Sequence, residues 1–126
     1  MRLLLDTHIV IWWATGSRLL GAKARDLIAA NDAELSISAA TWWELAIKRA
    51  LGRLDIDFTE ARRDFQKREV KMLPVSFDHA EAAAALPRLH GDPFDRMLVA
   101  QAAAEQLVLL TRDKHLAAYG PMVLLA

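Results

Sequence analysis

The sequence predicts an α/β fold in three layers, with a central, mainly parallel sheet between two layers of helices. Short, uninterrupted apolar runs recur along the chain, and helical patterns separate them. Such runs are typical of strands that are buried on both faces, as the strands of a parallel sheet are. Strands that alternate with helices are joined by right-handed crossovers, which cover both faces of the sheet. The 126 residues suffice for one core, so we expect a single domain over residues 1–126.

Five segments carry the strand pattern, and each is a short run of apolar residues that turn or helix signals interrupt. They are Leu3–Leu5, Leu35–Ser38, Lys71–Val75, Leu107–Leu110 and Met122–Leu125. Pro74 has no backbone N–H to give to a neighbouring strand. The third segment is therefore expected to end there or to lie at an edge of the sheet.

Seven segments are predicted to be helical from the spacing of their apolar residues and from their capping residues. They are Ile9–Ala14, a helix from Leu20 to near Asn31, a helix from Ser38 or Thr41 to Leu51, Glu60–Arg68, an alanine-rich helix from Asp78 that Pro87 ends, Pro93–Gln106 and Lys114–Tyr119. Gly16 and Gly52 close two of them. Thr59 can cap the fourth helix, and Asp78 with Glu81 has the spacing of a capping box.

The bulk composition excludes several classes of protein. Basic and acidic residues balance at 16 each, so a nucleic-acid role requires a local patch or a bound metal rather than a general attraction. There is no cysteine, which excludes disulfides and thiolate zinc sites. Asp6 and His8 interrupt the apolar N-terminus, and no apolar run is long enough to cross a bilayer. We therefore expect a soluble, cytoplasmic protein that does not enter a membrane.

The stretch His90–Arg96 predicts a loop that ends in the start of a helix. Asp92 has the position of an N-cap, and Pro93 follows at the first helical position, where its missing N–H costs nothing. Asp95 then falls in the first turn, near the positive end of the helix dipole. Capping and dipole interaction would explain both acids without any chemistry.

Three further acids are expected at the same edge of the sheet as Asp95, where the carboxyl ends of parallel strands form the usual ligand site. Asp6 directly follows the first strand, and Asp113 comes three residues after the fourth. Glu44 lies early in the helix after the second strand. The order of elements alone therefore brings Asp6, Glu44, Asp95 and Asp113 together.

Each of these acids also has a purely structural explanation. Asp6 can cap the helix after it, and Asp113 can cap the short helix at Lys114. Glu44 has capping-box spacing from Thr41 and salt-bridge spacing to Lys48. Four such explanations converging on one edge are less expected, because clustered carboxylates repel one another unless a cation lies among them. An all-oxygen cluster prefers Mg²⁺ or Mn²⁺, and such ions assist phosphodiester hydrolysis.

Four motifs together resemble a PIN-domain ribonuclease, and more narrowly the VapC-type toxins of bacterial toxin–antitoxin pairs. They are Asp6-Thr7-His8, Trp43–Lys48, Asp92–Arg96 with Leu98–Ala102, and Thr111-Arg112-Asp113. The resemblance spans nearly the whole chain, although Ile56–Lys71 carries no family motif. It implies a PIN-like fold and a metal-dependent endoribonuclease in which Asp6, Glu44, Asp95 and Asp113 hold Mg²⁺, with Mn²⁺ as the substitute. It further implies an RNA substrate and a cognate antitoxin that occludes the active site.

Residues near the acids allow supporting roles as well as structural ones. Thr7 and Thr111 can orient the acids by hydrogen bonds or can simply be turn residues. Arg96 and Arg112 can contact RNA phosphates, although solvated helix-end charges are commoner. His90 is nearest the acids and can shape the site, but beside four carboxylates it is not expected to bind the metal.

Basic and aromatic residues away from the acids leave similar alternatives. A run of four basic side chains can follow an RNA backbone or form a solvated face: Arg62, Arg63, Lys67 and Arg68. Two tryptophan pairs, Trp12-Trp13 and Trp42-Trp43, can stack on bases, but packing in the core or at a subunit interface is favoured. Trp12-Trp13 and the alanine- and leucine-rich helices lead us to expect a homodimer.

Four other functions compete with the ribonuclease. A phosphatase of the α/β class needs Asp-x-Asp after the first strand, where this chain has His8. A receiver domain needs an acceptor Asp after a middle strand, and none follows Val75. A non-catalytic nucleic-acid-binding domain has no need of all four acids, and a DNA nuclease would use the same cluster.

Overall fold

The computed structural model describes residues 1–126 and confirms the three-layer α/β architecture. Its sheet contains β1 (Arg2–Leu5), β2 (Glu34–Ser38), β3 (Lys71–Leu73), β4 (Val108–Thr111) and β5 (Val123–Leu125). The strands lie in the order β3-β2-β1-β4-β5, and every neighbouring pair is parallel. As predicted from Pro74, β3 ends directly before the proline and forms an edge of the sheet.

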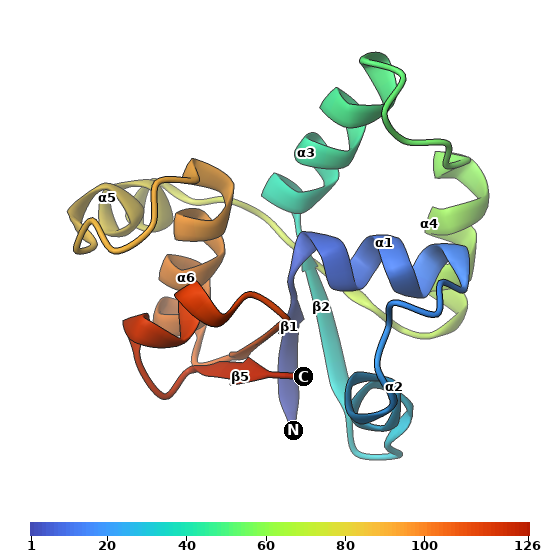
Figure 1. Ribbon diagram of the computed structural model, residues 1–126, viewed down its shortest axis with the longest axis horizontal. Coiled ribbons are helices and arrows are strands. Elements are labelled where there is room, and N and C mark those ends of the chain that lie inside the picture. Colours follow the sequence, from blue (N-terminus) through green and yellow to red (C-terminus); the bar gives the residue numbers. More distant parts are fainter.

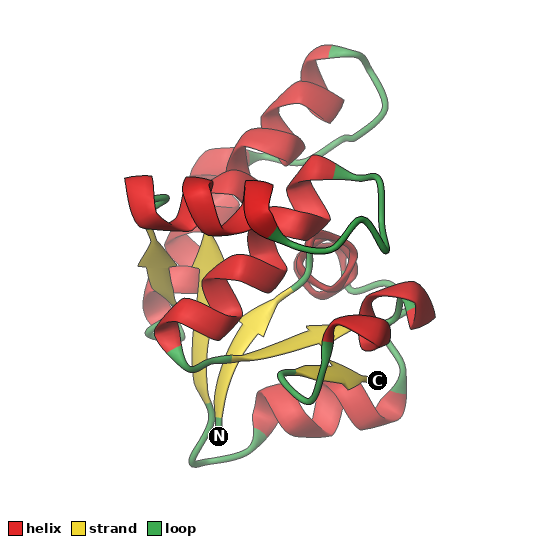
Figure 2. Cartoon of the chain, turned by 90° about the vertical axis from the view of Figure 1, so that its left-hand side faces the viewer, coloured by secondary structure: helices red, strands yellow, loops and turns green.

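Helices cover both faces of this sheet (Figures 1 and 2). They are α1 (Thr7–Thr15), α2 (Ala22–Ala29), α3 (Ala39–Ala50), α4 (Phe58–Lys67), α5 (Phe77–Ala85), α6 (Pro93–Glu105) and the 3₁₀ helix η1 (Lys114–Tyr119). In Figure 1, α1, α2 and α4 lie on one side of the central strands, and α5 and α6 lie on the other. None of the helices combines the length and the apolar character that crossing a lipid bilayer requires.

The alternation of side chains along β1 divides the core into two parts. Leu3 and Leu5 pack into a cluster with residues of α1, α2, α3 and α4. Leu4 points to the opposite face and packs with Leu98 and Val99 of α6. All three leucines of β1 are fully buried, which explains why the apolar run has no polar interruption.

Two predicted helix starts were wrong, and a third, for which Ser38 and Thr41 were both open, is decided by the structure. Ser38 caps α3, because its hydroxyl accepts the Ala40 N–H at 3.0 Å, so Thr41 lies inside the helix. Asp57, rather than Thr59, caps α4 through the Glu60 N–H at 3.1 Å, which brings Phe58 into the helix to pack against Trp42. Ser76, rather than Asp78, caps α5. In each case a residue two or three positions earlier has the stronger or better placed acceptor.

The capping box of α5 has an unusual partner. The Ser76 hydroxyl accepts the His79 N–H at 3.1 Å, and the Ser76 N–H is donated to His79 Nδ1 at 3.0 Å. Histidine thus occupies the position that Glu or Gln usually takes. The predicted capping box of Asp78 with Glu81 therefore lies two residues after the observed one.

The carboxyl ends of the central strands β1, β2 and β4 lie at one edge of the sheet, where the predicted acids are expected. Leu5 of β1 is aligned with Leu110 of β4, and the Asp6 N–H extends the pairing by donating to Leu110 O at 3.0 Å. The carboxyl end of β2 leads directly into α3 through Ser38. The first turns of α1 and α3 and the end of β4 therefore meet at one edge.

Candidate active site

Asp6 is fixed at the end of β1 by hydrogen bonds to both of its carboxylate oxygens. Oδ1 accepts the Thr7 N–H at 2.8 Å, which also makes Asp6 the N-cap of α1. Oδ2 accepts the hydroxyl proton of Thr111 at 2.8 Å. Burial raises the pKa of Asp6 above its ordinary value, and these two hydrogen bonds oppose that increase. The predicted capping role of Asp6 is confirmed, and it coexists with a place in the site.

Glu44 lies one and a half turns into α3 and faces the start of α1. Its Oε1 accepts the hydroxyl proton of Thr7 at 2.7 Å, and its Oε2 lies 3.7 Å from Lys48 Nζ. The predicted salt bridge to Lys48 is confirmed. The capping-box alternative for Glu44 was wrong, because Ser38 and not Thr41 caps the helix.

Asp95 is the most poorly compensated acid of the site. Asp92 caps α6 by accepting the N–H groups of Phe94 at 2.8 Å and Asp95 at 3.4 Å. The Asp95 carboxylate has no such partner, and only 17% of its side chain is exposed. Burial, followed by the charges of Asp6 and Asp92, raises the pKa of Asp95 to about 7. The two acids of this helix start therefore lie in different surroundings: Asp92 is the predicted N-cap, and Asp95 is a poorly compensated carboxyl group.

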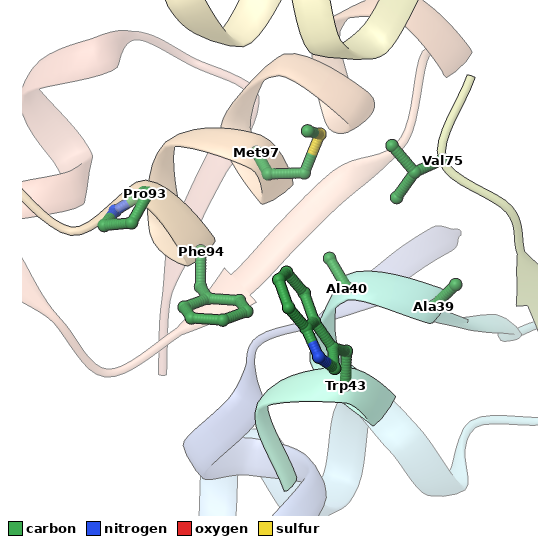
Figure 3. A pocket seen from close by; sticks show the side chains of 7 residues that line it. All are labelled: Ala39, Ala40, Trp43, Val75, Pro93, Phe94 and Met97. Atoms are coloured by element: carbon green, nitrogen blue, oxygen red, sulfur yellow. The ribbon is translucent and has the colours of Figure 1, made fainter. Parts of the chain in front are cut away.

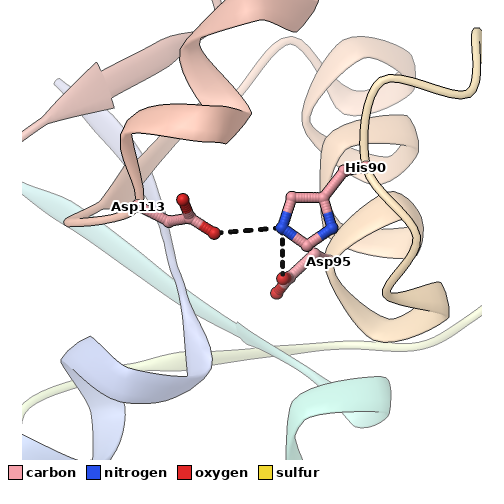
Figure 4. A group of neighbouring side chains, drawn as sticks. All are labelled: His90, Asp95 and Asp113. Carbon is pink, nitrogen blue, oxygen red and sulfur yellow. Dashed lines mark hydrogen bonds and ion pairs between the residues drawn. The ribbon is translucent and has the colours of Figure 1, made fainter.

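Asp113 caps η1 through the His115 N–H at 2.9 Å and also faces the loop that precedes α6. Its Oδ2 lies 3.0 Å from His90 Nε2, and the same ring nitrogen lies 3.4 Å from Asp95 Oδ2 (Figure 4). Burial acts to raise the pKa of Asp113, but the hydrogen bonds from His115 and His90 lower it overall. His90 therefore joins the two acids that come from α6 and from the end of β4.

The four predicted acids thus form one connected group. Thr7 joins Glu44 to Asp6, because its N–H and its hydroxyl serve one acid each. Thr111 joins Asp6 to Asp113, because its hydroxyl donates to Asp6 and accepts the Asp113 N–H at 3.0 Å. Of the two alternatives for these threonines, hydrogen bonding to the acids is the one that the structure shows.

The donor set of this edge fits a divalent cation. The charges of Asp6 and Glu44 both act to raise the pKa of Asp95, so the carboxylates lie close enough to repel one another. Lys48 is the basic residue that pairs with the group, and it pairs only with Glu44. Oxygen ligands with surplus negative charge are what Mg²⁺ and Mn²⁺ prefer. His90, Asp95 and Asp113 also present one ligand atom each within 4.8 Å of one another.

The two arginines that flank the acids have structural partners. Arg96 donates to the carbonyl oxygens of Ala83 and Leu86 at 3.0 Å each, and at longer distance to Pro87 and His90. It therefore holds the loop before α6 against the end of α5. Arg112 donates to Leu19 O and lies 5.6 Å from the centre of the Trp12 ring.

The tryptophans divide into three that pack inside the chain and one that does not. Trp12, Trp13 and Trp42 pack against the larger core cluster, and Trp13 stacks on Phe65 at 5.4 Å. Trp12 and Trp13 therefore pack within the chain and do not form a free apolar surface. Trp43 is 64% exposed and makes an edge contact with Phe94 at 5.4 Å.

An apolar pocket beside the acids was not predicted from the sequence. It has a volume of about 550 Å³ and lies between the starts of α3 and α6 (Figure 3). Its lining consists of Ala39, Ala40, Trp43, Val75, Pro93, Phe94 and Met97. Trp43 and Phe94 directly precede Glu44 and Asp95, so the helical pattern could have indicated that the two rings share an edge with the acids.

Comparison with known proteins identifies the family of this fold. The family model of the PIN domain matches residues 3–120. Ribonuclease VapC22 of Mycobacterium tuberculosis is 32% identical over 115 residues, which are 90% of this chain and 88% of that protein.

Solved structures agree with this match. A chain of a toxin–antitoxin complex from Klebsiella pneumoniae is 25% identical with a TM-score of 0.66, and the alignment covers 97% of this chain and 95% of that one. A chain of VapBC2 from Rickettsia felis, bound to a DNA fragment from its promoter, has a TM-score of 0.71 at 16% identity, with 100% of this chain and 98% of that one covered. The second likeness supports the fold alone.

Proposed function

The chain belongs to the PIN-domain family, in its VapC-type branch, and from this we propose that it is the RNA-cleaving toxin of a toxin–antitoxin pair. Asp6, Glu44, Asp95 and Asp113 are its proposed catalytic residues and hold Mg²⁺, or Mn²⁺ in its place. The ribonuclease activity of the relative from M. tuberculosis supports RNA over DNA as the substrate. The phosphotransfer alternative has no support from the family match.

The observation that carries the proposal is the uncompensated charge around Asp95. A folded chain gains nothing from placing Asp6, Asp92 and Glu44 where they oppose the ionisation of a largely buried carboxyl group. A divalent cation would reverse this effect, because it attracts each of the same carboxylates. The cost of assembling the cluster is therefore consistent with selection for ion binding rather than for stability.

Some residues of the site would bind the cation, and others orient the carboxylates that bind it. Asp6 is held rigidly by Thr7 and Thr111, so its remaining lone pairs point in a fixed direction. Asp95 accepts no backbone hydrogen bond, so its carboxylate is the freest to bind an ion. A bound cation would supply an activated water and neutralise charge on the scissile phosphate. Without it, the acids would repel the RNA backbone.

A protein antitoxin is the proposed partner, and the similar chain from Klebsiella pneumoniae comes from a toxin–antitoxin complex. A cluster of carboxylates attracts an inserted guanidinium much as it attracts a metal ion. We therefore expect a basic side chain of the antitoxin to reach Asp6 and Asp95. Changing Asp6→Asn or Asp95→Asn should weaken antitoxin binding, whereas unchanged affinity in both variants would mean that the antitoxin inhibits elsewhere.

A homodimer is also proposed, through the apolar pocket rather than through Trp12-Trp13. Phe77 is 91% exposed at the start of α5, and Trp43 and Val75 of the pocket are exposed as well. Exposed apolar side chains in such a group are typical of a protein interface. Sedimentation should show a dimer at micromolar concentration that Val75→Ser weakens, because Val75 lines the pocket and is exposed. A monomeric wild-type chain would contradict this proposal.

The test of the function is cleavage of a single-stranded RNA by the purified protein. We expect cleavage with Mg²⁺, no cleavage with EDTA, and recovery when Mg²⁺ is added in excess of the chelator. Cleavage that EDTA leaves unaffected would contradict the metal mechanism. Single-stranded DNA of the same sequence serves as the control, and equal cleavage of both would contradict the choice of RNA.

A further inference from the structure

We propose that His90 is a positioning residue, which donates a hydrogen bond from Nε2 to Asp113 and so orients that carboxylate for the cation without binding the cation itself. This inference rests on the proposed metal site. The position of the ring alone leaves two roles open, metal ligand or hydrogen-bond donor to the acids. Its ligand atom lies within 4.8 Å of those of Asp95 and Asp113, which is close enough for all three to hold one ion.

The protonation of the ring follows from its other nitrogen. His90 Nδ1 lies 3.1 Å from the backbone nitrogen of Asp92, which donates its proton to the ring. A backbone N–H is always a donor, so Nδ1 offers its lone pair and carries no proton. A neutral imidazole then has its single proton on Nε2. The nitrogen that faces the acids is therefore a donor, and it has no lone pair to offer to a metal.

The geometry at Nε2 agrees with this assignment. The 3.0 Å separation from Asp113 Oδ2 is a normal hydrogen-bond length, whereas Asp95 Oδ2 lies 3.4 Å from the same nitrogen without forming a hydrogen bond (Figure 4). An ionised carboxylate has about four lone-pair sites. The hydrogen bond from His90 therefore fixes the direction of the Asp113 carboxylate and leaves its other lone pairs free for a cation.

The ring is held in this orientation by the surrounding loop. The His90 N–H donates to the hydroxyl of Tyr119 at 3.1 Å, and that hydroxyl donates to Pro87 O at 2.9 Å. Arg96 donates to His90 O at 3.4 Å and to the end of α5. Only 18% of the His90 side chain is exposed. Rotating the ring to expose a lone pair at Nε2 would break the bond from Asp92 at the start of α6.

Two substitutions separate the two nitrogens of the ring. In His90→Asn the side-chain oxygen can still accept the Asp92 N–H, but the amide is too short to reach Asp113. In His90→Gln the longer side chain can place an amide N–H near the position of Nε2, but the acceptor for Asp92 is lost. The pair therefore tests whether the donor to the acids or the support of the loop matters for the metal.

The experiment measures Mn²⁺ binding by calorimetry, without RNA. Loss of a hydrogen bond to a ligating side chain typically lowers metal affinity by about 10- to 100-fold. We expect this loss in His90→Asn, and a loss of less than about tenfold in His90→Gln. Equal losses in both variants, or a greater loss in His90→Gln, would overturn the positioning role.

A second readout follows the ring directly. The ¹⁵N chemical shifts of the His90 ring should show the proton on Nε2 without metal, and they should still show it in saturating Mg²⁺. A proton found on Nδ1 in either state would overturn the inference, and a shift to Nδ1 on adding Mg²⁺ would make His90 a ligand. Failure of the wild-type chain to bind Mn²⁺ would instead contradict the proposed function, even with the ring protonated on Nε2.

Discussion

His79 and His90 have the same hydrogen-bond arrangement in two regions of very different chemistry. Each Nδ1 accepts the backbone N–H of a helix N-cap, from Ser76 before α5 and from Asp92 before α6. Each Nε2 then faces a carboxylate, Glu105 at 2.8 Å and Asp113 at 3.0 Å. The same arrangement of N-cap, histidine ring and carboxylate therefore occurs at the starts of the two neighbouring helices α5 and α6.

The two regions differ in the charge that surrounds the ring. Near His79 the charged partner is the single acid Glu105, which is 43% exposed, and the next neighbour is the amide of Gln101. Near His90 lie both Asp95 and Asp113, and Asp6 and Glu44 add further negative charge. Pairing a histidine with an acid is therefore not a sign of function. The surplus of carboxylates is what distinguishes the edge that is proposed as the active site.

The largest effect is expected in the His90 region, where Asp95 and its neighbour Asp92 should respond differently to substitution. Asp95→Asn should reduce RNA cleavage to background, while in EDTA the stability stays unchanged or rises slightly, because repulsion is relieved. Asp92→Ala removes a cap and should cost about 0.5–2 kcal/mol of stability with only a partial loss of cleavage. Thermal unfolding and an RNA assay check both. A folded, inactive Asp92→Ala beside an active Asp95→Asn would reverse the assignment.

A second large effect is expected at Thr111, which joins Asp6 to Asp113. Thr111→Val keeps the shape of the side chain but leaves a buried Asp6 oxygen without its donor, so Mn²⁺ affinity should fall by about 10- to 100-fold. Thr41→Val is the matched control, because its hydroxyl contacts only the Thr7 hydroxyl at 3.4 Å. Calorimetry in which both valine variants bind Mn²⁺ equally well would show that Thr111 does not orient the acids.

The His79 region should respond in stability alone. His79→Ala removes the acceptor for the Ser76 N–H and the partner of Glu105, so unfolding should become easier by about 1–3 kcal/mol. Mn²⁺ affinity and RNA cleavage by the folded variant should match the wild type. A loss of Mn²⁺ binding in this variant would remove the contrast between the two histidines.

The smallest effect is the dependence of metal-free stability on pH. The pKa of Asp95 is raised to about 7 in the folded chain from an ordinary value of 3.8, so the folded state holds more protons between these values. The contribution of protonated Asp95 to the free energy of unfolding is complete below about pH 4 and is lost as the pH rises through about 7. Asp6 acts in the same direction, and the lowered pKa of Asp113 acts in the opposite one.

Thermal unfolding in EDTA across this pH range measures the effect. Asp95→Asn should lose less stability than the wild type as the pH rises, because it has no carboxyl group to ionise. Parallel curves for the two proteins would contradict the raised pKa. Mn²⁺ affinity of the wild type should increase over the same range, since a ligating carboxylate must be deprotonated.

The sequence predicted the parts of this structure that depend on regular patterns. The five strands, their parallel arrangement and the edge position of β3 follow from apolar runs and from Pro74. The four acids could be placed together because the carboxyl ends of parallel strands share an edge. Their connection through Thr7 and Thr111 was expected as an alternative and is now seen in hydrogen bonds.

What the sequence missed depends on contacts between side chains that are distant or irregular. Competing acceptors such as Asp57 and Thr59 both satisfy the capping rule, and only packing of Phe58 decides between them. The donor role of His90 follows from a bond to Asp92, two residues later, that the loop conformation alone permits. The apolar pocket requires the relative placement of α3 and α6.

The most direct test of the charge surplus is a crystal of the wild-type chain soaked in Mn²⁺, with anomalous diffraction measured near the manganese edge. We expect an anomalous peak among Asp6, Glu44, Asp95 and Asp113, with His90 Nε2 directed at a carboxylate rather than at the ion. No peak is expected beside His79 and Glu105. Crystals of active protein without a peak among the four acids, or with the ion bound elsewhere, would contradict this expectation.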